Sequence, residues 1–311
     1  MSLASGIIAA IISGAVVGHP VFRFTDPTIT EASALIDLGP LMVTTNDSGG
    51  GPFVYVVDAR TGATVGRTTY TTSVVDTEAL APAGLHAVWV GDIGDNDAVR
   101  SSVQVYRVPV GRGDRTVHAT RYNLVYPGGP RDAESLLVGR DGRLRIISKG
   151  ILGGSAYLAP KHLDPDHPNR LRRIASIGIF ATDAALFPDG KHVLIRGYDN
   201  AIIDTFPGFR EIAEVSLPYQ QQGEGVSIGR TGRIRLSSEG VHSPVLQVRL
   251  PANVEARLHP VVRSTAPTVV EDAGDNGSAL PGGRWTWLGA GGLAVLLGGR
   301  LVLGARRRRQ Q

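Results

Sequence analysis

Cysteine is missing from the 311 residues, which excludes disulfide bonds but does not argue against export, because many exported bacterial proteins lack them. Several catalytic signatures are missing as well. These are a Walker loop, HExxH or HxH metal pairs, and a Gly-x-Gly-x-x-Gly turn between a strand and a helix. No nucleophile or general base can be assigned from a motif, so the catalytic residues stay unknown and the sequence leaves open whether the protein is an enzyme.

Basic residues are scarce outside the C-terminus, although the whole chain has a formal net charge of +4 and a pI near 9.6. Six arginines lie in the last 28 residues, and without them 26 basic residues face 28 acidic ones. The remaining chain is therefore slightly acidic and offers no positive field for phosphate groups. We expect no nucleic-acid partner.

Long apolar runs occur only at the two ends of the chain. Residues 3–18 are uncharged and mostly apolar, which predicts that 1–18 is a signal peptide or a retained N-terminal apolar segment. Residues 285–304 are about as long as a bilayer core requires and are interrupted only by Arg300. The arginines that follow predict a single-pass transmembrane helix and a basic cytoplasmic tail over 284–311, which places the bulk of the chain outside the cytoplasm at the cell membrane.

A polar segment precedes this span. Residues 264–283 are rich in Ser, Thr, Pro, Gly and Asp, which predicts a flexible stalk. The run Leu-Pro-Gly-Gly-Arg at 280–284 resembles a degenerate cell-wall sorting signal, but it lacks the Thr that a sortase attacks. Retention in the membrane is therefore the expectation, and cell-wall association is the alternative.

Many short apolar runs separated by Gly, Pro, Asp and Asn predict an all-β domain over residues 19–263. An acidic residue followed by small and apolar residues recurs in it, at Glu31, Glu78, Glu134, Asp183 and Glu224. The separations of 47, 56, 49 and 41 residues are typical of the blades of a β-propeller. We predict five blades, with 19–24 closing the ring; six blades, with 251–264 contributing, are the alternative.

A polar cluster ends the second strand of each predicted blade. The end of that strand lies beside the start of the first strand in an antiparallel pair, so acids and clusters should meet at the mouth of the central channel. The candidate ligand-binding residues are Glu31, Asn46, Asp47, Glu78, Asp92, Glu134, Lys149, Asp183, Arg196, Tyr198, Glu224 and Glu239. The structural alternative is that each acid caps backbone N–H groups or pairs with an arginine of the next blade.

The loop Gly-Asp-Ile-Gly-Asp-Asn-Asp at 91–97 is a candidate metal site. Carboxylates and loop carbonyls supply the six to eight hard oxygens that Ca²⁺ requires. The predicted ligands are Asp92, Asp95, Asn96 and Asp97. The alternative is a polar hairpin loop in which Asx side chains cap backbone groups.

The motifs "DTEALA", "VWVGDIGDND", "DAESLLV", "TDAALFPDGKHVLIRGY" and "LSSEGVHSPVLQV" resemble a family of exported actinobacterial β-propellers of unknown function, over residues 28–250. That family is similar to phytase-like and esterase-like propellers. The resemblance implies the propeller fold and an extracytoplasmic location. The Asp-Asp-Pro-Ala motif associated with propeller phytases is missing here, which weighs against hydrolysis of inositol phosphates.

Two functions remain from these observations. The first is a membrane-anchored binding or interaction module that presents its polar channel mouth to a ligand of the cell envelope. The second is a Ca²⁺-dependent hydrolase of the phytase-like or esterase-like kind, in which the metal would polarise an ester and activate water. The expected partners are that envelope ligand and the cell membrane through 285–304.

Overall fold

The computed structural model describes residues 12–47, 49–70 and 72–258, which belong to the first of two compact units of the chain. The second unit, 263–311, lies outside the described residues, together with the predicted stalk, transmembrane helix and tail. The predicted signal segment is described only from residue 12 onward. Across the part that is described, no helix has both the length and the apolar character needed to cross a membrane.

The described strands form five sheets, numbered here as blades and given from the inner to the outer edge. Blade 1 consists of β3 (Ala32–Asp37), β4 (Leu41–Asn46), β5 (Phe53–Asp58), β6 (Thr64–Tyr70) and β10 (Arg115–Val117). Blade 2 consists of β7 (Thr77–Pro82), β8 (Ala87–Asp92), β9 (Val103–Pro109), β11 (Arg121–Val125) and β15 (Asn169–Arg170). Blade 3 consists of β12 (Ala133–Val138), β13 (Leu144–Ser148), β14 (Gly154–Leu158) and β16 (Arg172–Ile177). Blade 4 consists of β17 (Asp183–Leu186), β18 (His192–Arg196), β19 (Asn200–Thr205), β20 (Glu211–Ser216) and β1 (Ile12–Ala15). Blade 5 consists of β21 (Gly223–Ile228), β22 (Ile234–Ser238), β23 (Pro244–Arg249) and β2 (Val17–Arg23).

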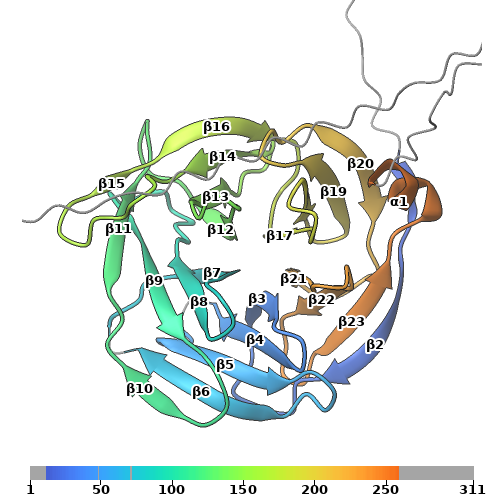
Figure 1. The fold of residues 1–311 in the computed structure, drawn as a ribbon, viewed down its shortest axis with the longest axis horizontal. Coiled ribbons are helices and arrows are strands. Elements are labelled where there is room, and N and C mark those ends of the chain that lie inside the picture. The colour runs from blue at the N-terminus through green and yellow to red at the C-terminus, as the bar shows by residue number, and fades with distance from the viewer. Residues whose placement is uncertain (1–11, 48, 71, 259–311) are drawn as a thin grey trace, which may run out of the picture. The chain divides into compact units, whose positions relative to one another are not determined.

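The five blades surround a common axis, with β3, β7, β12, β17 and β21 nearest to it (Figure 1). The described part of the chain is therefore a five-bladed β-propeller, which confirms the all-β prediction. A short helix, α1 (Ala252–Leu258), follows the last blade, so residues 251–258 build no sixth blade.

The ring closes through its first and last strands. β2 pairs antiparallel with β23, from Val17 opposite Arg249 to Arg23 opposite Pro244, so blade 5 contains both ends of the propeller. The predicted closure by 19–24 is confirmed, and the pairing begins two residues earlier. This pairing covers the outer edge of β23 and holds the ring together.

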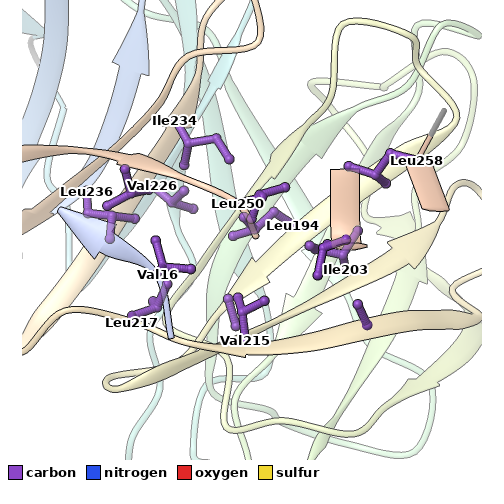
Figure 2. Close-up of a cluster of buried hydrophobic side chains, with 14 of the residues drawn as sticks. Val16, Leu194, Ile203, Val215, Leu217, Val226, Ile234, Leu236, Leu250 and Leu258 are labelled. Atoms are coloured by element: carbon purple, nitrogen blue, oxygen red, sulfur yellow. The ribbon is translucent and has the colours of Figure 1, made fainter. Parts of the chain in front are cut away.

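Apolar side chains of neighbouring blades pack against each other and form the core. The inner strands β4 and β12 are buried over nearly their whole length because both faces lie against another blade, whereas the outer strand β6 alternates between buried and half-buried residues. Figure 2 shows the cluster between blades 4 and 5, where Leu194 and Ile203 pack with Val226 and Leu236, and α1 adds Leu258.

The start of the first strand and the end of the second are paired in the same way in every blade. The paired residues are Ala32 with Asn46, Thr77 with Asp92, Ala133 with Ser148, Asp183 with Arg196 and Gly223 with Ser238. Equivalent strand ends therefore meet at one end of the central channel, called the channel mouth below. The connections between second and third strands, and those that lead from one blade into the next, lie at this end.

Candidate cation site at the channel mouth

A β-bulge follows this pairing in four of the five blades. Glu78 and Glu134 are the extra residues in blades 2 and 3, Ser33 is the extra residue in blade 1, and Glu224 lies in the irregular stretch of blade 5. A bulge breaks the alternation of a strand and re-aims a side chain. The three glutamates lie close enough to shift one another's pKa, with Glu134 acting on both Glu78 and Glu224.

The pairing corrects one assignment made from the sequence repeat. Glu31 lies two residues before the bulge of blade 1, and the residues at the same position in blades 2 and 3 are Asp76 and Asp132. The counterpart of Glu78 in blade 1 is Ser33, whose hydroxyl donates to Oε2 of Glu78 at 2.8 Å. The spacing of acids alone cannot reveal this, because the residue types of a strand do not show at which position a bulge adds a residue.

Three carboxylates lie close enough to share one metal ion. One oxygen each of Asp47, Asp76 and Glu78 lies within 4.8 Å of the other two, and this is the one such group of His, Asp or Glu among the described residues. Oxygens that bind one Ca²⁺ at its usual distances lie at most about 5 Å apart, so the spacing fits a shared ion. Asp47 follows β4 of blade 1 and the other two lie at the start of β7 of blade 2, so this triad bridges two blades.

The loop after β8 supports the triad. The carboxylate of Asp92 accepts hydrogen bonds from the N–H groups of Val75 and Asp76, at 3.1 and 2.9 Å, and pairs with Arg100 at 2.8 Å. Gly94 donates its N–H to the carbonyl of Asp76 at 3.1 Å, and a Cβ at this glycine would overlap with the Asp76 carboxylate. The loop therefore fixes the backbone at Asp76 and leaves room for its side chain only because residue 94 has none.

The residues predicted as Ca²⁺ ligands in this loop are not grouped around an ion position. Asp95 accepts hydrogen bonds from the N–H groups of Val99 and Arg100, at 2.9 and 3.0 Å. Asn96 and Asp97 are exposed. In the part of the chain that is described, Asp92, Asp95 and Asp97 do not form a group with metal spacing. The alternative reading, Asx side chains that cap backbone groups, fits the contacts of Asp92 and Asp95.

Three buried carboxylate oxygens at the mouth accept no hydrogen bond from the described residues. They are Oδ1 of Asp76, Oε2 of Glu134 and Oε2 of Glu224. Each of these residues is at least nine-tenths buried. A buried acceptor without a partner costs about 1–3 kcal/mol, and more when it is charged. A bound cation would supply the missing partner.

Burial and mutual repulsion raise the pKa values of these acids. Desolvation is the largest cause at Asp76, whose pKa rises to about 7, and the charge of Asp47 is the next. Desolvation also leads at Glu134, whose pKa rises to about 8, and at Glu78, where the charge of Glu134 comes second. The pKa values of Glu224 and Glu239 are raised by burial as well. A divalent cation reverses this effect, because it stabilises the ionised carboxylates.

Lys149 lies inside this group of acids. Its Nζ forms an ion pair with Oε1 of Glu134 and lies 5.0 and 5.7 Å from the ring centroids of Phe180 and Tyr198. Burial lowers the pKa of Lys149, but the ion pair with Glu134 outweighs burial, so its pKa is raised. The structure thus brings the predicted residues Glu134, Lys149 and Tyr198 together as one side of the mouth.

Blade 4 contributes a different kind of acid. The carboxylate of Asp183 accepts hydrogen bonds from the N–H groups of Ala184 and Val226, both at 2.7 Å, and is buried. Its partner strand carries Arg196, whose fully buried guanidinium donates to the carbonyls of Gly225 and Ser237 at 2.6 and 2.8 Å. Burial raises the pKa of Asp183 and lowers that of Arg196 to about 10. These two predicted ligand-binding residues join blade 4 to blade 5.

The remaining predicted residues lie around the edge of the mouth. Asn46 is buried, and its Oδ1 accepts hydrogen bonds from the N–H groups of Thr30 and Glu31 at 3.2 and 3.3 Å, so it orders the approach to β3. Glu239 forms a hydrogen bond with Glu224, and its pKa is raised first by burial and then by the charges of Asp47 and Glu31. Glu31 and Glu239 thereby belong to the same acidic region as the triad.

Two acids of the mouth were missed when single acids were chosen from the repeat. Asp76 and Asp132 lie two residues before Glu78 and Glu134, and both influence the pKa of their neighbours. The signal was present in the sequence, because "DTE" and "DAE" place a second acid at the same position in both copies.

No protein-family model matches the chain, and no curated protein is similar to it. Among solved structures, one described as a streptogramin B lyase structure is similar with a TM-score of 0.43 and 11% identity, covering 76% of this chain and 98% of that one. A second, hydrazine synthase of Kuenenia stuttgartiensis, has a TM-score of 0.36 and 14% identity, covering 76% of this chain and 60% of that one. The assignment of the β-propeller fold rests on the five sheets of this chain itself.

Proposed function

We propose that this β-propeller is a binding module whose channel mouth holds a divalent cation, and that Ca²⁺ is the ion the site fits best. The observation that carries the proposal is the triad of Asp47, Asp76 and Glu78, whose oxygens lie within 4.8 Å of one another. The unpartnered buried oxygens of Asp76, Glu134 and Glu224 give it independent support. Ca²⁺ accepts carboxylates in irregular arrangements, whereas Mg²⁺ demands a near-ideal octahedron.

The cation gives the mouth a way to bind a further ligand. If each carboxylate of the triad binds through one oxygen, three of the six to eight positions of Ca²⁺ are filled. Water or an oxygen of the ligand takes the others. Lys149, which is paired with Glu134, adds one positive charge to the mouth. The sequence-based expectation of an extracytoplasmic location makes this ligand a component of the cell envelope.

Thermal unfolding with and without Ca²⁺ tests the proposal. At a free Ca²⁺ concentration 100 times the dissociation constant, linkage stabilises the folded chain by about 2.7 kcal/mol. For a domain of this size we expect the Tm to rise by roughly 5–10 °C. No rise in Tm, together with no heat of Ca²⁺ binding in titration calorimetry, would remove the cation from the proposal.

A pair of matched variants assigns the effect to the mouth. Asp76→Asn should raise the Tm of the Ca²⁺-free chain, because it removes a buried like charge, and should abolish the rise with Ca²⁺. Asp204→Asn is the control, because Asp204 in β19 is also buried, has a pKa raised by burial to about 7 and has an unpartnered Oδ1. It lies outside the triad, so its variant should keep the full response to Ca²⁺.

The same site supports a second function, metal-dependent hydrolysis of phosphate or other esters. The observation in its favour is that the pKa of Glu134, which lies outside the triad, is raised to about 8, which suits a general acid or base near a metal ion. Aryl esters and phosphate monoesters, each with Ca²⁺ or with a chelator, test this function. Turnover that requires Ca²⁺ and is lost in Asp76→Asn would favour the hydrolase over the binding module.

A further inference from the structure

The large apolar side chains that the described residues expose are concentrated at one end of the propeller. Seven of nine lie in connections at the channel mouth, and together they are called the apolar rim: Val75, Val99, Ile151, Leu152, Tyr198, Tyr219 and Val241. The other two, Val17 and Leu85, lie at the opposite end. Single exposed apolar residues are normal on any protein, but their accumulation around one opening marks a surface that another molecule covers.

The strongest part of the rim is a turn tip in blade 3. Gly153 donates its N–H to the carbonyl of Gly150 at 2.9 Å, which closes a turn with Ile151 and Leu152 at its tip. These side chains are 89% and 100% exposed, at positions where turns usually carry Gly, Pro, Asn, Asp or Ser. Neither residue packs against the propeller, so neither is explained by the fold. In the connection from β20 to β21, Tyr219 is 88% exposed.

The centre that the rim surrounds is strongly acidic. Five acids there have raised pKa values, and the charges of three further carboxylates contribute to these shifts. The five are Asp76, Glu78, Glu134, Glu224 and Glu239, and the three are Glu31, Asp47 and Asp132. Lys149 and Arg100 offset part of this charge, but Lys149 is paired with Glu134 and Arg100 with Asp92. A bound divalent cation would reduce the negative charge without removing it. The surface therefore combines an acidic centre with an apolar edge.

We propose that the channel mouth and the apolar rim form a docking surface for a protein segment that carries an Arg or Lys side chain between apolar residues. The basic group enters the acidic centre, and its apolar neighbours contact Ile151, Leu152 and Tyr219. The acidic centre repels anionic lipid headgroups, so a protein segment fits the surface better than a membrane does. The inference rests on the proposed binding role of the mouth, but it does not require Ca²⁺.

Binding of short labelled peptides to the purified full chain, followed by fluorescence polarisation, tests this inference. One peptide places Arg between Leu residues; matched peptides replace Arg by Gln or by Glu, or Leu by Ser. We expect the Arg–Leu peptide to bind, and each replacement to weaken binding by about tenfold or more. Binding of the Arg–Leu peptide should also weaken as salt is raised, because the attraction is electrostatic.

Two double variants separate the rim from the rest of the surface. Ile151→Ser with Leu152→Ser should weaken binding of the Arg–Leu peptide by about tenfold, because both side chains act as apolar anchors. Val17→Ser with Leu85→Ser is the matched control, since these side chains are 81% and 65% exposed at the other end, and it should leave binding unchanged. All four residues are exposed, so neither variant removes packing from the core.

Three results would overturn the docking surface. They are equal binding of the Arg, Gln and Glu peptides, equal loss in the two double variants, and rim-dependent binding to phosphatidylcholine vesicles, with or without phosphatidylserine, in place of the peptide. The rise of Tm with Ca²⁺ is read on the same samples. If Ca²⁺ still raises the Tm but the Arg–Leu peptide binds no better than the matched peptides, only the docking surface is rejected. If the Arg–Leu peptide binds but Ca²⁺ does not raise the Tm, only the cation is rejected.

Discussion

Blades 2 and 4 each place an acid at the mouth end of the inner strand, and the two acids have different surroundings. In blade 4, Asp183 accepts two backbone hydrogen bonds at 2.7 Å and stands opposite Arg196. In blade 2, Glu78 lies on a bulge beside two other carboxylates, and Oδ1 of its neighbour Asp76 has no partner among the described residues. Asp183 is part of the scaffold, whereas Glu78 lies close to other carboxylates whose charges raise its pKa.

The bulge explains much of this difference. The pairing of Asp183 with Arg196 continues regularly into Ala184 with Ile195, so the carboxylate stays where N–H groups of its own and the next blade can reach it. In blade 2 the pairing skips Glu78, and the added residue turns an acid toward the other carboxylates. An acid whose oxygens accept backbone hydrogen bonds, such as Asp183, joins two blades. An acid on a bulge, such as Glu78, lies with other carboxylates at the mouth.

The largest effect is expected from Arg196→Leu. The variant removes donors to Gly225 and Ser237 and leaves Asp183 as a buried charge without its counter-charge. Each buried acceptor that loses its donor costs about 1–3 kcal/mol, so we expect a total loss of roughly 3–5 kcal/mol, which lowers the Tm by roughly 6–20 °C. Arg172→Leu, at an exposed position of β16, should change stability by at most about 0.5 kcal/mol. A loss below about 1 kcal/mol for Arg196→Leu would contradict a scaffold role.

Gly94→Ala should damage the triad more than the fold. Its Cβ would overlap with the Asp76 carboxylate and lie 2.9 Å from Cγ of Glu78, so the triad must rearrange. We expect a loss of about 1–3 kcal/mol and no rise of Tm with Ca²⁺. Gly178→Ala is the control, because a Cβ there meets nothing within 4 Å. A full Ca²⁺ response in Gly94→Ala would show that the ion binds elsewhere.

The repeat in the sequence was sufficient to predict the fold because strand pairing follows chain order. The spacing of the acids indicated five blades, and residues 19–24 were predicted to close the ring, which β2 confirms. Turn signals were equally local: Gly142, Gly190 and Gly232, which lie between first and second strands, all have a positive φ, as the turns there require. Features set by residues near each other in sequence were therefore predictable.

The site was predictable only in part, because its geometry depends on β-bulges and on backbone contacts, which the residue composition does not show. No pattern of residue types separates Glu78, which lies on a bulge, from Asp183, which does not. The loop carrying Asp92 and Asp95 looked like a cation site, but backbone N–H groups take up both carboxylates. Whether an acid faces an amide or another acid is decided by the neighbouring blade.

The contrast between satisfied and repelling acids also predicts a dependence on pH. Burial raises the pKa values of Asp76 and Glu134 to about 7 and about 8, above their ordinary values of 3.8 and 4.5. The folded chain therefore holds these protons more tightly than the unfolded chain. The stabilisation is complete below about pH 4 and is lost as pH rises through about 7–8. Without Ca²⁺, stability at the mouth should thus decrease toward alkaline pH.

Ca²⁺ requires the ionised carboxylates, so the Tm rise that it causes should grow over the same range. Thermal unfolding at pH 5 and pH 8, with Ca²⁺ and with a chelator suited to each pH, measures both effects. We expect the Ca²⁺-induced rise at pH 5 to be less than about half of that at pH 8. Equal rises at the two pH values would mean that the ion does not compete with protons for these acids.

The smallest effect is expected from Ser33→Ala, which tests the bulge position of blade 1. The Ser33 hydroxyl donates to Oε2 of Glu78 at 2.8 Å, and this bond favours the ionised carboxylate. Its loss should cost about 1 kcal/mol, raise the pKa of Glu78 further and weaken Ca²⁺ binding without abolishing it. Ser135→Ala is the matched control, because Ser135 is equally buried on an inner strand and its hydroxyl has no partner among the described residues. That variant should be neutral or slightly stabilising, since it removes an unsatisfied group. If both variants behave alike, Ser33 fills space in blade 1 and does not prepare Glu78 for a cation.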